Sequence, residues 1–264
     1  PRARIDGLFL SPGDVNLNGF NRPRMDRRLW GVYTTVPALR KGLAGEFYVL
    51  RHDQGFSGVL RTNSFGGRLV GKSASGWGFE AEGVLQNGEA GVKRHRGAGL
   101  FISVSRRLEV GARPLTVVGE YKRASGTKDP SDPSGSTTFD QLYPANHDKF
   151  GHEDLLGWRN IQNMRAQAGY GVHKLLTLTL MYDDSWLDSA KDAMYNLGGA
   201  PIARDPLGRS GRHIGREVDL FATVKLKKVT FGAGYGRFFA GEFVKKTTPG
   251  VGPDLFYVYQ DIHF

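Results

Sequence analysis

Short segments in which apolar and polar residues alternate recur along the whole chain, separated by glycine, asparagine, aspartate and proline. One of the clearest covers residues 174–187, where Leu176, Leu178 and Leu180 share one face and Thr177 lies on the other. A period of two predicts a β-strand, because successive side chains of a strand point to opposite faces. The pattern therefore predicts an all-β fold with about twelve strands. They cover residues 3–10, 29–36, 43–51, 59–71, 76–86, 97–108, 114–123, 158–171, 174–187, 213–225, 229–239 and 255–264.

Several of these segments carry charges on one face and none on the other. In residues 217–226, Val218 and Leu220 alternate with Glu217 and Asp219. A strand that separates lipid from water needs two such faces. A soluble β-sandwich has the same period, so the alternation alone does not separate the two architectures. A helical membrane protein is excluded, because no apolar run approaches the roughly 20 residues that a transmembrane helix requires.

The lengths of the connections favour a membrane barrel. Some connections are tight, such as 172–174 and 226–229, whereas 124–157 and 188–212 are long. Short turns at one rim and long loops at the other are typical of outer-membrane barrels. Counting strands puts Lys174 and the pair 227–228 at the periplasmic rim and both long loops outside the cell. We therefore expect residues 1–264 to form one antiparallel transmembrane β-barrel domain.

Glycine and aromatic residues occur together in several strands, most densely in residues 231–236 (FGAGYG). Glycine inside a strand marks a bend or a place where another group approaches the backbone closely. We expect these glycines to lie at bends or beneath aromatic rings of a neighbouring strand.

The last predicted strand alternates up to the end of the sequence. Phe256, Val258, Ile262 and Phe264 share one parity. This ending resembles the C-terminal signal of bacterial outer-membrane proteins. We expect it to be a closing strand, because a barrel in lipid must leave no unpaired edge. Pairing with residues 3–10 would complete a small barrel, and any other partner would make the chain part of a larger barrel of 16–18 strands.

The composition limits the classes of binding partner and of metal or disulfide site that the chain can have. The chain has 36 Lys plus Arg against 26 Asp plus Glu, a net charge of +10, which favours anionic partners. Basic clusters lie at 22–28, 93–96 and 204–216; solvated loops facing anionic lipid head groups account for such clusters equally well. The chain has no cysteine, which excludes disulfides and thiolate metal sites.

The most specific pattern lies in the long connection between 137 and 163, which reads TFD, then LYP, NH, FG and a further aspartate. In this run the chain resembles the alginate-export family of bacterial outer-membrane barrels. Residues 29–33, 217–220 and 234–238 look similar to the family as well. The motif residues of the loop are Phe139, Asp140, Tyr143, Pro144, Asn146, His147, Phe150, Gly151 and Asp154.

The resemblance implies a monomeric outer-membrane pore that passes anionic, alginate-like polysaccharide or smaller anions by passive, charge-selective diffusion. It also implies contact with outer-membrane lipid and lipopolysaccharide, insertion by the barrel-assembly machinery, no nucleic-acid partner and no catalytic residue or cofactor. Family members carry further strands ahead of the region that matches Pro1, which again points to a larger barrel.

A lumen that passes polyuronate needs cations to attract carboxylates and some acids to prevent tight retention. By parity, the best lumen-facing cations are Arg68, Arg165 and Lys225, each of which alternates with apolar neighbours. Charge pairs that merely brace the barrel wall would give the same pattern. The matching pore-lining acids are Glu80, Glu82, Asp183, Glu217 and Asp219.

The long loop also concentrates histidines and acids, including His147, His152 and Asp140. Carboxylates and carbonyls are the ligands that Ca²⁺ prefers, so a structural calcium ion is one interpretation. Hydrogen bonds within a loop folded into the lumen or over its mouth are the favoured alternative. The calcium candidates are Asp148, Glu153 and Asp154.

Two other function classes remain open from the sequence. One is a barrel enzyme of the lipase or protease type, for which Ser185, His147 and Asp183 are the only combination we single out. The other is a soluble, basic β protein that binds anionic polymers.

Overall fold

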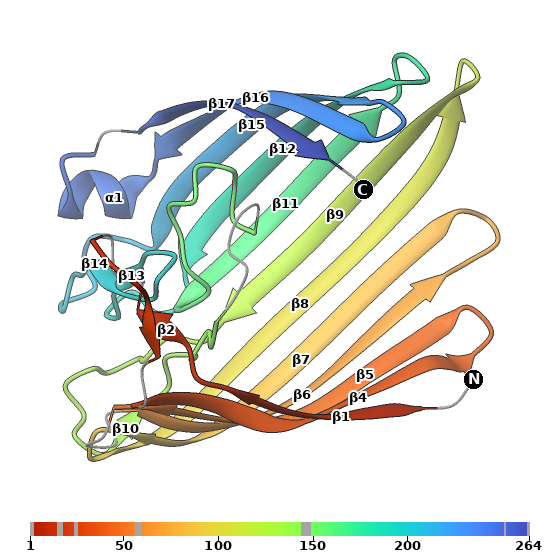
Figure 1. Cartoon of the computed structure of the whole chain (residues 1–264). Helices are drawn as coiled ribbons and strands as arrows, with labels where there is room; N and C mark the ends of the chain where they lie inside the picture. The colour runs from red at the N-terminus through yellow and green to blue at the C-terminus, as the bar shows by residue number, and fades with distance from the viewer. Residues whose placement is uncertain are drawn as a thin grey trace.

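Twelve long strands form one antiparallel sheet in which each strand pairs with the next along the chain (Figure 1). The computed structural model describes residues 3–14, 18–23, 26–55, 60–143, 149–250 and 252–262. The twelve segments predicted from the alternation coincide with these strands, which confirms the all-β antiparallel fold. The strands are β1 (Arg4–Leu10), β4 (Arg27–Arg40), β5 (Leu43–Gln54), β6 (Leu60–Lys72), β7 (Trp77–Ala90), β8 (Lys93–Val110), β9 (Arg113–Ala124), β11 (Ile161–Tyr170), β12 (Leu176–Leu187), β15 (His213–Lys225), β16 (Val229–Ala240) and β17 (Asp254–Ile262).

Short elements in the connections escaped the sequence analysis. They are too brief to show a period of two. They are β2 (Gly13–Asp14), β3 (Arg22–Pro23), β10 (Gly135–Ser136), which pairs in parallel with β8, β13 (Met194–Tyr195), β14 (Pro201–Ala203) and helix α1 (Glu242–Thr247). Among the described helices, none is long and apolar enough to cross a membrane.

The two faces of the sheet differ as the alternation predicts. Leu180 and Leu220 are direct partners across β12 and β15, and both are more than half exposed on the convex face. Asp183 and Asp219, on the opposite parity of the same strands, are buried. A band of exposed apolar side chains on the outside is what a strand facing lipid requires.

The connections follow the predicted rim rule, except for the two-residue turn 91–92, which lies at the rim of the long loops. Tight turns such as 111–112 join strands at one end of the sheet, and Gly111 and Ala112 both have positive φ, as a two-residue hairpin requires. The connections 125–160 and 188–212 both leave from the other end. The two long loops therefore share one rim, as expected. That this rim faces the outside of the cell remains a prediction.

The main buried apolar cluster lies among the long connections at that rim. Phe139 and Phe150 from the first loop, Met194 from the second and Phe243 from α1 belong to it. Inter-loop packing of this kind holds both loops in fixed positions over the end of the sheet.

Two of the three glycines of β16 lie beneath aromatic rings, as predicted, and the third, Gly236, lies against Asp219. A Cβ on Gly232 would lie 2.0 Å from the ring of Tyr259, and one on Gly234 would lie 2.4 Å from the ring of Tyr257. The rings therefore lie flat on the backbone of β16.

Within the described residues, β1 pairs with β4 and β17 pairs with β16, so these two strands form the edges of the sheet. A pairing of β17 with β1, one of the two alternatives for the closing strand, is not among the pairings of these residues. Phe264, the predicted closing residue, lies outside the described part of the chain.

Candidate functional site

The connection between β9 and β11 folds back inside the curve of the sheet and touches two separate parts of the wall (Figure 1). At one end, Asp140 lies 2.7 Å from Nδ1 of His52 on β5. Further along, Nδ1 of His152 lies 2.9 Å from the hydroxyl of Tyr257 on β17. This segment, residues 125–160, is the inner loop below. It matches the favoured interpretation of a loop folded inward.

The motif residue Asp140 docks the first part of the inner loop. Its carboxylate accepts hydrogen bonds from Nδ1 of His52 and, at 2.6 Å, from Oγ1 of Thr62. Its backbone N–H donates to Oε1 of Gln86, whose Nε2 donates back to the Asp140 carbonyl. Burial opposes ionisation of this carboxyl, but the hydrogen bonds from His52 and Thr62 hold its pKa below the ordinary value. Nε2 of His52 in turn lies 3.1 Å from the hydroxyl of Tyr143.

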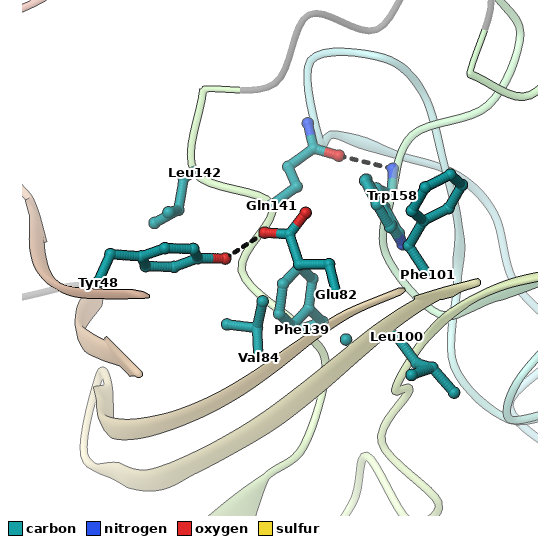
Figure 2. A pocket seen from close by; sticks show the side chains of 10 residues that line it. Tyr48, Glu82, Val84, Leu100, Phe101, Phe139, Gln141, Leu142 and Trp158 are labelled. Atoms are coloured by element: carbon teal, nitrogen blue, oxygen red, sulfur yellow. Dashed lines mark hydrogen bonds between the residues drawn. The ribbon is translucent and has the colours of Figure 1, made fainter. Parts of the chain in front are cut away.

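Below this anchor, the loop covers a small hollow of about 140 Å³ (Figure 2). Phe139 and Leu142 of the loop face Val84 of β7 across it. At its polar side the hydroxyl of Tyr48 donates to Glu82, and Oε1 of Gln141 accepts from the backbone N–H of Trp158. Glu82, predicted as a pore-lining acid, therefore lies beside the inner loop.

Charged side chains from neighbouring strands form pairs on the concave face. Nε of Arg68 donates to Glu80 at 2.7 Å, and its Nη1 donates to Glu46 at 2.9 Å. All three side chains are about one quarter to one third exposed. Arg68 and Glu80 thus face the interior, as their parity predicts.

A second group of pairs lies on β9, β11 and β12. Nε of Arg165 donates to both carboxylate oxygens of Asp183, at 3.0 and 3.1 Å. Nζ of Lys122 lies 2.7 Å from Glu120, and Nη1 of Arg165 lies 3.8 Å from the same carboxylate. The sequence analysis did not include Glu120 and Lys122 among the pore-lining residues, because only the strand register shows that Glu120 faces Arg165.

The two groups of pairs meet at a hollow of about 420 Å³ on the concave face. Four cationic and three acidic side chains line it, together with Phe101, Trp158 and Gln167. The structure thus brings together two of the three predicted pore cations, with Lys122 and Lys149 in addition. The cations are Arg68, Lys122, Lys149 and Arg165, and the acids are Glu80, Glu82 and Glu120.

Lys225, the third predicted cation, lies elsewhere. It is an exposed residue at the end of β15, and its backbone N–H donates to the carbonyl of Leu175 in the tight turn before β12. It therefore belongs to the rim of short turns and does not line the hollow that Arg68 and Arg165 share.

The predicted acids Glu217 and Asp219 face inward but are covered by the inner loop, with 2% and 1% of their surface exposed. The backbone N–H of Glu153 donates to Glu217 at 2.9 Å, and Gly151 packs so closely that a Cβ there would lie 2.1 Å from the Glu217 carboxyl. Burial and the nearby charge of Asp219 raise the pKa of Glu153 to about 7.

The calcium interpretation gains no support from the described part of the chain, where no three His, Asp or Glu side chains are placed to hold a metal ion. His152 is engaged with Tyr257, and Asp154 lines another hollow, of about 690 Å³. Four further candidates in the loop fall outside the described residues: Pro144, Asn146, His147 and Asp148.

Of the combination considered for an enzyme, the two described residues are engaged in other contacts. Asp183 is held by Arg165, and Oγ of Ser185 accepts from Nδ2 of Asn163. His147 lies outside the described residues.

Comparison with known proteins gives a family match and matches to solved structures. A family model described as "Alginate export" matches residues 3–258. The crystal structure of a double variant of OccD1 (OprD) superposes on the chain with a TM-score of 0.52 at 13% sequence identity. The match covers 98% of this chain and 65% of that one, so the chain spans about two thirds of that structure's length. No curated protein matches the chain.

Proposed function

Because the chain belongs to the alginate export family and is a bacterial outer-membrane protein, we propose that its pore passes anionic polysaccharide or smaller anions by passive, charge-selective diffusion. The fold is that of outer-membrane transport porins. The convex face suits lipid and lipopolysaccharide, and the polar concave face provides a path for hydrated solutes. We propose that the protein acts as a monomer, without a cofactor or catalytic residue.

One observation carries the proposed anion preference: the four cationic side chains that line a single hollow between the wall and the inner loop. Guanidinium groups bind carboxylates through two parallel hydrogen bonds, and ammonium groups act as point charges. Three carboxylates line the same hollow, and Glu46 and Asp183 pair with Arg68 and Arg165, so the acidic and basic charges there nearly balance. Conduction requires such a balance, because an ion that is held too strongly does not leave.

Two substitutions test this function. Arg68→Glu and Arg165→Glu each change the charge of the hollow by −2, so the reversal potential in a salt gradient should shift toward cation preference. The shift should be largest at low ionic strength, where screening is weak. Planar-bilayer recordings measure it directly.

Arg237→Glu is the matched control. This arginine lies on the convex parity of β16 and contacts Phe239 and Asp254. The Arg237→Glu substitution makes the same charge change outside the concave face and should leave the ion selectivity unchanged. Wild-type channels that prefer cations, or equal shifts in all three variants, would refute the proposal.

A further inference from the structure

An aromatic surface lies on the concave face beside the charged hollow. The rings of His152 and Tyr257 are nearly parallel, 8° apart with centroids separated by 5.4 Å. Tyr257 and Tyr259 continue the row at 6.4 Å and 22°. Phe221 of β15 contacts His152 at 4.9 Å. The row formed by His152, Tyr257 and Tyr259 is the aromatic platform below.

The platform is fixed in place by the strand beneath it. Because Gly232 and Gly234 lack a Cβ, the rings of Tyr259 and Tyr257 lie directly on the backbone of β16. The hydroxyl of Tyr257 is held by His152, and that of Tyr259 lies 3.3 Å from Oγ1 of Thr223. A ring fixed this way loses little conformational entropy when a ligand packs on its exposed face.

The platform lines a hollow of about 690 Å³, within the size range of small-molecule sites. Its other walls include Arg165, Gln167 and Asp154. Arg165 and Gln167 also line the neighbouring hollow of about 420 Å³, so the two spaces meet at these residues.

Arg165 retains an unused hydrogen-bond donor. Its side chain is 7% exposed, and its Nε and Nη1 point toward Asp183 and Glu120. Nη2 has no hydrogen-bond acceptor among the described residues. A buried donor without a partner is costly, and a ligand carboxylate would satisfy it.

These groups match the chemistry of a sugar acid. The C–H bonds on a pyranose face carry partial positive charge and pack favourably on the negative face of an aromatic ring. Gln167 and Asp154 can hydrogen-bond to sugar hydroxyls, and Arg165 can take the carboxylate. We propose that the hollow between the aromatic platform and Arg165 is a binding subsite for one uronate unit of an acidic polysaccharide. This inference rests on the proposed function, since it deepens the substrate class of the same pore.

Binding is measured by isothermal titration calorimetry on the detergent-folded protein, with an oligouronate and a neutral oligosaccharide of equal length. We expect Tyr257→Ala to raise the oligouronate Kd about three- to tenfold, the range that corresponds to a lost aromatic contact. Tyr257→Phe keeps the ring and should bind within about twofold of wild type. Arg165→Gln should remove the preference for the acidic sugar. Tyr235→Ala, on the convex parity of β16, is the matched control.

The outcomes separate the subsite from the pore function. Oligouronate binding that depends on Tyr257 supports the subsite even if bilayer recordings show no anion preference, in which case only the proposed function fails. Equal affinity for the neutral sugar, or a Tyr257→Ala variant that binds like wild type, would overturn the subsite even in an anion-selective channel. A heat-modifiable band on gels confirms that each variant is folded.

Discussion

Asp140 shows how one buried carboxylate fixes a loop to a wall. It is 4% exposed and accepts hydrogen bonds from His52 and Thr62, residues that lie 88 and 78 positions away in the sequence. Its motif neighbours have equally specific contacts: Phe139 covers the hollow of Figure 2, and Gly151 fits against Glu217. The motif residues that the structure describes therefore position the inner loop.

Removing the Asp140 charge tests this role. Asp140→Asn should weaken docking of the inner loop by about 1.5–3 kcal/mol, the usual contribution of hydrogen bonds to a charged group. Limited proteolysis within residues 137–157 should become faster. Asp129→Asn, at an exposed acid of the same loop, should leave the cleavage rate unchanged, and equal acceleration in both variants would contradict the anchor.

At the level of elements, the strands followed directly from the sequence. A period of two marked all twelve strands, and the parity of Arg68, Arg165 and Asp183 put them on the face that carries the charge pairs. The contacts of these residues did not follow, because pairing of Arg165 with Glu120 depends on the register of two strands. The docking of residues 139–154 also could not be predicted, since a local pattern carries no information about contacts between positions 54 to 105 residues apart.

The inner loop should also respond to pH through Glu153. Its pKa is raised to about 7 in the folded protein, above the ordinary value of 4.5, so the folded state favours the protonated form. The free energy that protonated Glu153 contributes to docking is fully present below about pH 4.5 and is lost as the pH rises through about 7. Glu217 and Asp219 lie next to Glu153, and the charges of Asp254 and Arg237 act on it with opposite sign, Asp254 raising and Arg237 lowering its pKa.

The prediction is that cleavage of residues 149–157 accelerates between pH 6 and pH 8, relative to an unstructured peptide of the same sequence. Glu153→Gln should reduce the pH dependence, because the amide does not titrate. A wild-type protein whose relative cleavage rate is flat across this range would show that Glu153 does not control docking.

Across the whole molecule, the convex face carries the contact with lipid. Leu220, which pairs with Leu180 in the middle of the wall, is 55% exposed there. Leu220→Arg should lower the free energy of unfolding by about 2–4 kcal/mol, the cost of a charge near the bilayer midplane. Urea unfolding in lipid vesicles measures this loss. Leu207→Arg, at an exposed loop position, should have little effect, and equal losses would contradict the assigned lipid face.

The attachment of the inner loop to both β5 and β17 has a mechanical consequence. A curved sheet can flex, and the width of the space it encloses would then vary. The inner loop is attached to two distant strands of the sheet and therefore holds that width nearly constant. The spacing between Arg68 on one side and Tyr257 on the other is then set by these two contacts, so loss of either would let the width of the passage vary while leaving every strand intact.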